Sequence, residues 1–447
     1  MKKVTVIGQG FVGFPMSIVL ASRLNKSKKN YFNVKGLEID NKRGRKIVDD
    51  INNRILPIKT YDQDLKKNFL KNLSKNYSAT CDLDEIQKSD IVVVSISFNF
   101  NKKKDLTNLF TLINKISKRI RKGSLILLET TLPPGMCEQK LYPIIKKNLK
   151  DRKIKISDIG FAYSYERVTP GKDYFNSIIS IPRNFSGIDL KSKKMCRNFL
   201  SKVLKNKNLL FELDTIIDCE SAKILENSYR ATNIALIDEW VKFSNVSKIN
   251  LTKILQSIRI RPTHKNIMSQ GLGVGGYCLT KDPKFLCYSS DKIFNSKTKF
   301  PITDVATKVN QEMPETSIDF IEKNFGSLRR KKMLIIGFTY KEDVGDFRNS
   351  PSIECAKKIK LKGGNVSLYD PFSDDYSNES NFKIVKEYDF KNYDIVLFCV
   401  KHKSTKKINI KNMLKKSYYF DLNNVYSISE VRNLKNKGYK FFQLGSN

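Results

Sequence analysis

Apolar and polar positions alternate in blocks along the first 200 residues of the chain. The apolar runs are of strand length, and this pattern predicts strands over Lys3–Ile7, Asn33–Ile39, Asp90–Ser97, Ser124–Glu129 and Asp158–Tyr163. An apolar helix follows the first strand to about Leu24, and further helical stretches lie between the last three strands. Such alternation is typical of a parallel, doubly wound sheet.

The pattern changes near Asp218 and changes back after Lys331. A helical pattern without Gly or Pro runs from Cys219 to about Asn245. Three more strands are then predicted, over Met333–Phe338, Asn365–Tyr369 and Asp394–Val400. We therefore expect an α/β fold with two Rossmann-like doubly wound domains joined by a central helical domain with a long helix. The expected domains are residues 1–210, 211–325 and 326–447.

A glycine-rich turn follows the first predicted strand. In the Gly8–Gly13 segment the first glycine permits a tight turn, the second lets a pyrophosphate approach the backbone, and the third allows close packing of helix on strand. An acidic residue carried by the second predicted strand can bind the ribose hydroxyls and would repel a 2′-phosphate, which favours NAD over NADP. The candidate NAD-binding residues are Gly8, Gly10, Phe11, Val12, Gly13 and Glu38. The alternative is a turn without a ligand.

The most distinctive stretch of the chain is a second glycine-rich segment, Gly271–Pro283. It delivers Cys278 next to a cation, Lys281, and a carboxylate, Asp282. A cysteine beside a lysine at a helix start has a lowered pKa and is a good nucleophile, so we expect a helix start and a reactive thiolate here. The alternative is a buried structural cysteine, which we expect for Cys81, Cys196, Cys219, Cys355 and Cys399.

Further motifs stand in a fixed order along the chain. They are Gly8–Gly13, Glu129–Thr131 with Pro133–Gly135, Glu166-Arg167 with Pro170-Gly171, the set Glu220, Lys223, Asn227, Arg230 and Glu239, the Cys278 loop, Gly337–Lys341, Asp346–Pro351 and Tyr369–Pro371. In this order they resemble the UDP-glucose/GDP-mannose dehydrogenase family, the NAD-dependent nucleotide-sugar 6-dehydrogenases. The resemblance spans nearly the whole chain.

The resemblance implies a four-electron oxidation in one site, in which the C6 alcohol of a nucleotide sugar becomes a carboxylate with two NAD. Lys223 and Asn227, spaced i, i+4 on one helix, would donate to the sugar oxygen. Cys278 would capture the aldehyde as a thiohemiacetal, which the second oxidation converts into a thioester. Glu166 is the leading candidate for activating the hydrolytic water, with Asp282 and Thr131 expected to hold a water or substrate oxygen. Which carboxylate is the base in each step stays open.

The resemblance also implies residues around the reacting groups. On the cofactor side it adds Thr131, Lys281 and Arg348; on the substrate side it implies Glu166, Lys223, Asn227, Arg261, Gly275, Gly276 and Lys341. Lys341 would reach the sugar, and Arg261 would cross a dimer interface into the partner's site. Glu220 and Arg230 extend the helix face that carries Lys223, and a solvated face is their alternative reading.

Three segments depart from the family pattern. A Val-Pro-Thr-Pro turn is replaced by Ser95–Asn99, the proline of a Ser-Pro-Glu block is replaced by Tyr165, and an arginine near Asp421 is replaced by Asn423. The first two affect the shape of the NAD and substrate loops, and the third puts contacts to the base or phosphate in doubt. None removes the implied catalytic set.

Composition bears on three other classes of protein: nucleic-acid-binding, membrane-spanning and metal-binding proteins. The 447 residues include 82 Lys and Arg against 45 Asp and Glu, a net charge of +37, but the lysines are scattered in short runs such as Lys102–Lys104. Nucleic-acid binders gather their charge on one face, so a basic nucleic-acid-binding protein is the weaker alternative. The apolar runs are too short for a membrane helix, and the eight cysteines lack a Cys-x-x-Cys pair. With two histidines, His264 and His402, a histidine-ligated metal site is not expected.

We therefore expect a cytoplasmic homodimer that uses NAD to oxidise a UDP-sugar, or a GDP-sugar, for surface-polysaccharide biosynthesis. UDP-glucose and UDP-N-acetylhexosamines are the expected substrates, and neither nucleic acid nor membrane is an expected partner. A two-electron dehydrogenase of the hydroxyacid type is the main alternative, since it would share the first domain and a helical lysine. It would have no use for Cys278 or for a second nucleotide-binding domain.

Overall fold

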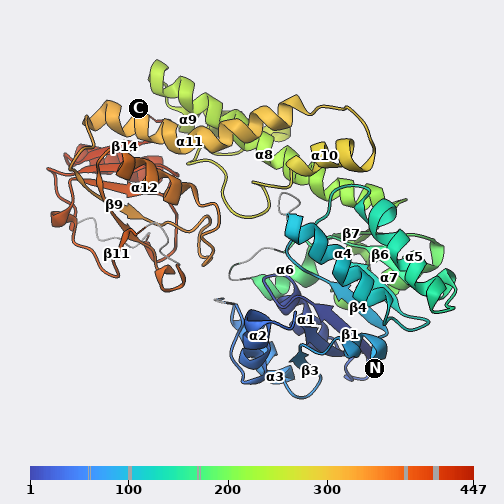
Figure 1. The fold of residues 1–447 in the computed structure, drawn as a ribbon. Helices are drawn as coiled ribbons and strands as arrows, with labels where there is room; N and C mark the ends of the chain where they lie inside the picture. Colours follow the sequence, from blue (N-terminus) through green and yellow to red (C-terminus); the bar gives the residue numbers. More distant parts are fainter. Residues whose placement is uncertain are drawn as a thin grey trace. The chain divides into compact units, whose positions relative to one another are not determined.

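The computed structural model describes residues 1–58, 60, 62–98, 103–168, 171, 173–376, 381–405 and 412–446. Asn99, Lys102 and Pro170, named above, lie outside the described residues. The chain divides into two compact units, one of residues 1–225 with 285–299 and the other of residues 226–284 with 300–447. The division falls within the long helix α8 (Ile216–Ser247), and each unit contains one sheet (Figure 1).

The first unit is built on an eight-stranded sheet in the order β3-β2-β1-β4-β5-β6-β7-β8. Its strands are β1 (Lys2–Ile7), β2 (Phe32–Leu37), β3 (Tyr77–Thr80), β4 (Ile91–Val94), β5 (Leu125–Leu128), β6 (Gly160–Tyr163), β7 (Arg183–Gly187) and β8 (Leu210–Glu212). All neighbouring strands are parallel except β6 and β7, which are antiparallel, so the predicted parallel sheet gains a reversed edge. The direction of winding changes between β1 and β4, where ligands of such sheets bind at the carboxyl ends of the strands.

Helices cover both faces of the first sheet. They are α1 (Gly13–Ser22), α2 (Lys42–Asn52), α3 (Gln63–Asn72), α4 (Lys103–Ser117), α5 (Tyr142–Asp151), α6 (Tyr174–Ser180) and α7 (Leu190–Val203). Alternate residues of the strands supply two apolar cores: Val93 and Leu127 pack with α1, α3, α6 and α7, whereas Val92 and Leu128 pack with α4 and α5. Burial of the central strands on both faces explains why they are continuously apolar.

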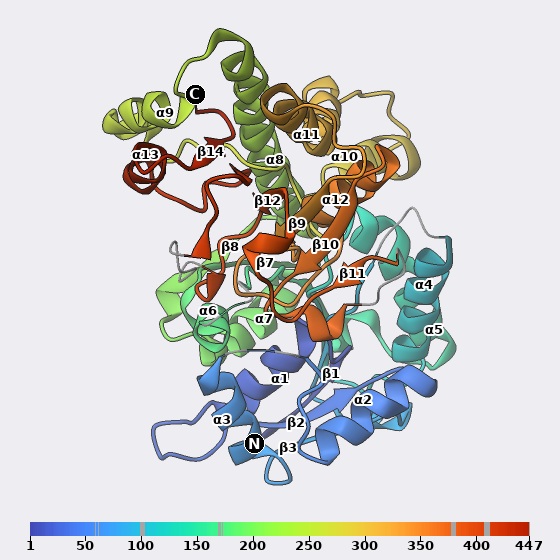
Figure 2. The same ribbon diagram turned by 90° about the vertical axis from the view of Figure 1, so that its left-hand side faces the viewer.

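The second unit is built on a six-stranded parallel sheet in the order β11-β10-β9-β12-β13-β14. Its strands are β9 (Lys332–Ile336), β10 (Asn365–Tyr369), β11 (Lys383–Ile384), β12 (Ile395–Phe398), β13 (Tyr418–Asp421) and β14 (Lys440–Gln443). One apolar core joins this sheet to α12 (Pro351–Leu361) and to the carboxyl-terminal part of α8, α9 (Leu251–Ile260) and α11 (Pro301–Phe325). The opposite face packs against α13 (Ile428–Asn436), and both helical layers can be followed in Figure 2.

The predicted elements agree with the structure in type and order, and most of the predicted strands are shorter than expected. The segment predicted over Asp90–Ser97 is a strand only over Ile91–Val94, and the long helix extends beyond its predicted ends to Ile216 and Ser247. The residues that follow the last hydrogen-bonded position of each strand form the loops at the carboxyl edge of the sheet. The division into three domains at residues 210 and 325 stays a prediction.

Candidate active site

The turn after β1 is tightly packed at Gly8 and Gly13 but leaves free space beside the exposed Gly10. Gly8 has a φ of +91°, and a Cβ on it would lie 2.7 Å from the carbonyl oxygen of Ser95. A Cβ on Gly13, the first residue of α1, would lie 1.8 Å from the oxygen of Gly8, so helix and turn are in close contact. A Cβ on Gly10 would meet nothing within 4 Å. The turn can therefore present its backbone to a pyrophosphate at Gly10.

Glu38, directly after β2, lies against this turn. Its Oε1 accepts a hydrogen bond from the backbone N–H of Gln9 at 2.5 Å. The Gln9 side chain is buried and is itself fixed, because it donates to the Val6 carbonyl at 2.8 Å and accepts from the Tyr77 hydroxyl at 2.9 Å. The carboxylate is thus held beside the turn, where an acidic side chain can bind ribose hydroxyls.

In the first unit, Lys223 and Glu166 are in direct contact. Nζ of Lys223 donates to the backbone carbonyl of Glu166 at 3.1 Å and lies 5.3 Å from the centre of the Tyr165 ring. The Glu166 carboxylate accepts from the N–H of Val168 at 2.5 Å. Thr131 is half-buried in the loop after β5, where the preceding Thr130 accepts from the N–H of Ile96 at 3.0 Å. Two expected catalytic residues, Lys223 and Glu166, are thus in direct contact.

Glu220 stabilises a loop, although it lies on the helix face that carries Lys223. Its two carboxylate oxygens accept from the N–H groups of Gly135 at 2.6 Å and Cys137 at 2.9 Å. The side chain is wholly buried, and burial raises the pKa of its carboxyl to about 8 in spite of these hydrogen bonds. Glu220 therefore fixes the segment that follows Thr131, one helical turn before Lys223.

The Cys278 loop lies flat on the Tyr340–Pro351 segment of the second unit. A Cβ on Gly275 would lie 2.7 Å from Cδ of Pro351, and one on Gly276 would lie 2.7 Å from the Tyr340 ring. The N–H of Gly276 donates to the carbonyl of Arg348 at 3.0 Å. The glycines are therefore required by close packing of this loop against the segment that precedes α12.

Asp282 is the centre of the polar network beside Cys278. Its side chain has no exposed surface; Oδ1 accepts from Nζ of Lys281 at 2.5 Å, and Oδ2 accepts from Nδ2 of Asn227 at 2.6 Å. The Cys278 carbonyl accepts from the N–H groups of Lys281 and Asp282, whereas its side chain is exposed. The structure thus brings four predicted site residues together within the second unit.

The prediction that a helix starts at Cys278 is wrong. Cys278 begins a turn, and the next helix, α10 (Lys284–Tyr288), begins six residues later. α10 has only one turn and starts beyond Pro283, so it does not begin at the thiol.

Aromatic rings support the cations of this loop, and the sequence patterns did not single them out. The Tyr277 ring contacts Nζ of Lys281 at 4.8 Å and the guanidinium of Arg348 at 4.9 Å. Arg348 also forms an ion pair with Asp346, with an N–O distance of 2.6 Å. Burial, together with the charges of Asp346 and Cys278, raises the pKa of Tyr340 to about 12. The only sequence signal for Tyr277 was its place directly before Cys278.

Two basic residues of the second unit lie close enough to interact. Burial lowers the pKa of Lys341, and the charge of Arg230 lowers it further. Like charges held near each other favour binding of an anion, which suits a nucleotide diphosphate. Arg261 is exposed at the end of α9, and its place across a dimer interface stays a prediction.

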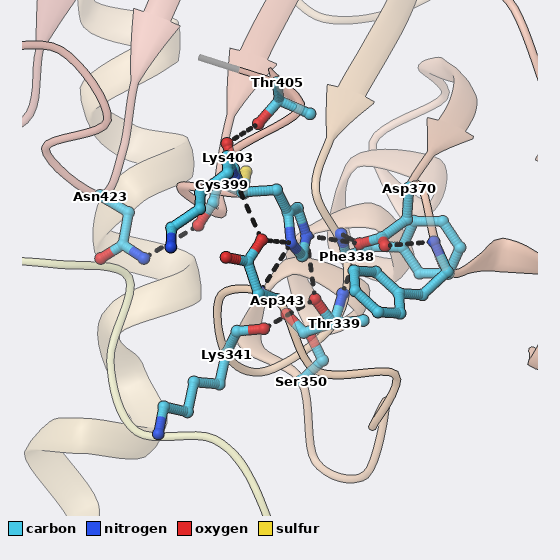
Figure 3. Close-up of polar contacts among 12 residues, drawn as sticks. Phe338, Thr339, Lys341, Asp343, Ser350, Asp370, Cys399, Lys403, Thr405 and Asn423 are labelled. Atoms are coloured by element: carbon cyan, nitrogen blue, oxygen red, sulfur yellow. Dashed lines mark hydrogen bonds and ion pairs between the residues drawn. The ribbon is translucent and has the colours of Figure 1, made fainter. Parts of the chain in front are cut away.

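The turn after β9 is closed by a buried carboxylate. Asp370 Oδ2 accepts from the N–H groups of Phe338 at 2.7 Å and Thr339 at 2.9 Å. Nδ1 of His402 accepts from the N–H of Asp343, so Nε2 carries the proton and donates to Asp370 at 3.2 Å. Figure 3 shows the Lys341 side chain pointing away from this network. The network therefore fixes the loop that carries Lys341.

Two other sequence observations can be placed. Asn423 donates to the Cys399 carbonyl at 2.9 Å, and a Cβ on Gly271 would lie 2.5 Å from the Asn423 Oδ1. This departure from the family pattern therefore packs against the start of the Cys278 loop.

The expectation that Cys81 is buried is wrong, because Cys81 is partly exposed. The other four cysteines expected to be structural are buried: Cys196, Cys219, Cys355 and Cys399. Cys81 lies at the end of β3, on the rim of the sheet, where the helices do not cover it.

Searches for two other kinds of site gave negative results over the described ranges. No group of three or more His, Cys, Asp or Glu residues there could hold a metal ion. Within the same ranges, no helix combines the length and the apolar character that a membrane span needs.

Three domain models of one family match the sequence. Residues 2–208 match the NAD binding domain of the UDP-glucose/GDP-mannose dehydrogenase family, residues 218–312 its central domain, and residues 334–428 its UDP binding domain. A UDP-N-acetyl-D-mannosamine dehydrogenase of Methanocaldococcus jannaschii is 30% identical over 460 residues, covering 99% of this chain and 96% of the relative.

Solved structures share the fold over the full chain. The UDP-D-ManNAc dehydrogenase from Pyrococcus horikoshii aligns with a TM-score of 0.81 and 22% identity, covering 99% of each chain. A UDP-glucose dehydrogenase from Pyrobaculum islandicum aligns with a TM-score of 0.81 and 17% identity, covering 100% of this chain and 98% of that one. At these identities the structures support the architecture alone.

Proposed function

The chain belongs to the UDP-glucose/GDP-mannose dehydrogenase family, and from this premise we propose that it oxidises the C6 alcohol of a UDP-sugar to a carboxylate. NAD is the cofactor, since the NAD binding domain of the family matches residues 2–208. The open flank of Gly10 fits a pyrophosphate, and the carboxylate of Glu38 beside the same turn fits a ribose. When bound, NAD accepts a hydride in each of the two oxidations.

We propose UDP-N-acetyl-D-mannosamine as the first substrate to test, with UDP-glucose as the second. The proposal is supported by the names of curated relatives, among them the Methanocaldococcus jannaschii and Campylobacter jejuni UDP-N-acetyl-D-mannosamine dehydrogenases. Lys341 would reach the sugar, and Arg230, a second cation near it, would favour binding of the diphosphate. A uronic-acid nucleotide sugar is a building block for glycosyl transfer, so its use in surface polysaccharide is part of this proposal.

In the first oxidation, the hydroxyl loses a proton as the carbon loses a hydride. Lys223 and Asn227 would stabilise the negative charge that develops on the sugar oxygen, one as a cation and the other as a neutral donor. Lys223 is 9% exposed, so its charge acts in a poorly hydrated environment. Asn227 is held at Asp282, which orients its amide.

In the second half of the reaction, the Cys278 sulfur adds to the aldehyde carbon and forms a thiohemiacetal. Loss of the second hydride leaves a thioester, and attack by water releases the carboxylate and restores the thiol. One water enters, and two hydrides and three protons leave. Glu166 and Asp282 are the candidate bases for the water; Thr131 would hold a water or a substrate oxygen. Lys281 and Arg348, close to the Cys278 loop, would stabilise negative charge beside it.

One observation carries this proposal: an exposed cysteine stands on a tightly packed loop beside the fully buried Asp282, which binds Lys281 of the same loop and Asn227 of α8. The test is NADH release by the purified protein with a panel of UDP-N-acetyl-D-mannosamine, UDP-glucose, other UDP-N-acetylhexosamines and GDP-mannose. We expect two NADH per sugar with a UDP-sugar, and Cys278→Ala should lower uronate formation about a thousandfold or more while NAD binding is retained.

Two results would contradict the proposal. One NADH per substrate would favour the two-electron hydroxyacid type of dehydrogenase. Normal uronate formation by Cys278→Ala would exclude the covalent mechanism.

We also propose that the protein is a homodimer. Tyr229, Leu236, Phe243 and Val246 lie on one face of α8 and are between 46% and 79% exposed. Large apolar side chains repeated along one exposed helix face are typical of an interface, and a second copy would cover them. Light scattering at micromolar concentration should give the mass of two chains; the mass of a single chain would contradict the proposed homodimer. Cytoplasmic location stays a prediction.

A further inference from the structure

Tyr165 is buried directly against the side chain that the proposed function makes central. It replaces the proline of the Ser-Pro-Glu block, and its side chain has no exposed surface. Nζ of Lys223 lies 5.3 Å from the centre of its ring. We propose that Tyr165 is a positioning residue that holds the Lys223 ammonium over its ring, ready to donate to the sugar oxygen. This inference rests on the proposed function.

The Lys223 ammonium needs compensation because it is largely removed from water. An ammonium has three N–H donors, and the Glu166 carbonyl accepts one of them at 3.1 Å. The face of an aromatic ring attracts a cation without offering a strong hydrogen-bond acceptor. A carboxylate in the same place would form an ion pair and compete with the developing alkoxide. The ring therefore stabilises the charge of the buried ammonium without accepting a strong hydrogen bond from it.

The hydroxyl end of the ring is fixed by two other residues. The Tyr165 oxygen accepts from Arg167 at 2.8 Å and from Nδ2 of Asn184 at 2.8 Å. Asn184 belongs to β7, the antiparallel neighbour of β6, and Arg167 also donates to the Pro182 carbonyl at 3.1 Å. The reversed strand thus binds the hydroxyl end of the ring, while the apolar core around Tyr165 holds the ring itself in place.

Ring fluorination separates this role from a structural one. Phenylalanine analogues with one, two or three ring fluorines in place of Tyr165 keep the shape of the ring but withdraw electron density from its face. We expect Tyr165→Phe to keep kcat within about threefold and kcat to fall stepwise with fluorination, by about tenfold over the series. KM for NAD and for the sugar, and the melting temperature, should stay nearly constant. A kcat that is flat across the series would overturn the inference.

A matched pair of leucine variants controls for lost packing. Tyr163 and Tyr165 are equally buried in the same apolar core, so Tyr163→Leu and Tyr165→Leu remove similar volumes. We expect similar losses of melting temperature, but about a tenfold loss of kcat for Tyr165→Leu alone. Equal kcat in the two variants would also overturn the inference. If either variant fails to fold, the fluorinated series decides.

Two controls distinguish failure of this inference from failure of the proposed function. Wild-type protein should release two NADH per UDP-sugar, and Lys223→Ala should lose turnover in the same assay. If wild-type protein oxidises no UDP-sugar, the proposed function fails and the inference falls with it. If both controls behave as expected and fluorination has no effect, only the role of Tyr165 is refuted.

Discussion

The turns that follow β1 and β9 begin in the same way and end differently. Gly8 and Gly337 both have positive φ, +91° and +84°, and each donates its N–H to the last residue of the neighbouring strand at 2.8 Å. In both turns, an acidic residue after that strand accepts from the next backbone N–H: Glu38 in the first sheet and Asp370 in the second. Up to this point the two turns share a positive φ at the glycine and the same pattern of hydrogen bonds.

After the acidic residue the two turns diverge. The first turn leads within five residues into α1, and the side of Gly10 is open. The second turn is filled by Phe338 and Thr339, both fully buried, and Asp370 takes both of their N–H groups. A long loop then leads to α12 and carries Lys341. The first turn can thus present backbone N–H groups to a ligand. In the second turn, backbone N–H groups donate to Asp370, so a ligand there would be bound by side chains such as Lys341.

The largest effect should come from removing the carboxylate of the closed turn. Asp370→Ala leaves two buried N–H groups and His402 without their acceptor, so we expect the free energy of unfolding to fall by about 3 kcal/mol. Glu38→Ala is the matched control; water can reach its half-buried site, so its loss should be below about 1 kcal/mol. Urea unfolding of both variants measures this. Equal losses would show that the two carboxylates play the same structural part.

A third carboxylate, that of Glu220, tests how burial changes the pKa of a carboxyl that accepts hydrogen bonds from backbone N–H groups. Glu220 also accepts two backbone N–H groups, but its folded-state pKa is about 8 against an ordinary value of 4.5. A raised pKa stabilises the fold below about pH 4.5 and loses that contribution as pH rises through about 8. Wild-type stability should therefore fall by about 2 kcal/mol more than that of Glu220→Gln between pH 6 and pH 9.

Urea unfolding at those two pH values provides the measurement for Glu220. Parallel pH dependences for the wild type and Glu220→Gln would mean that the carboxyl does not titrate in this range. Activity need not be measured, because the comparison concerns folding alone.

The smallest effect should distinguish ligand binding from folding at the open turn. A Cβ on Gly10 meets no atom of the chain, so Gly10→Ala should leave the melting temperature unchanged. It should still raise the Kd for NAD about tenfold, since the methyl group lies where the pyrophosphate approaches. Gly13→Ala is the control that should destabilise the fold, because its Cβ would lie 1.8 Å from the Gly8 oxygen. Calorimetric titration with NAD reads the first effect; unchanged affinity would place the pyrophosphate elsewhere.

The sequence predicted what depends on local pattern. The type and order along the chain of the predicted elements, the β1 turn with Glu38, the long helix and the Cys278 loop all follow from periodicity and glycine spacing within short windows. The contacts of Tyr165 with Lys223, and of Asp370 with His402, join residues 32 or more positions apart, and no local pattern contains them. Strand β7 and its reversed direction were both missed, because Arg183–Gly187 contains a single large apolar residue and shows no strand pattern. The expected helix start at Cys278 was wrong because glycines and a following proline also describe a turn.

The distribution of the cysteines has a practical consequence for experiments on this protein. Five of the eight are buried, two are half-buried and Cys278 is exposed. Burial raises the pKa of the inner thiols, that of Cys219 to about 12, so at neutral pH they hold almost no thiolate. A mild alkylating reagent should therefore attach a fluorophore or a spin label at Cys278 first. The chain thus provides its own spectroscopic labelling position, without engineering, on the loop where bound ligands would protect it.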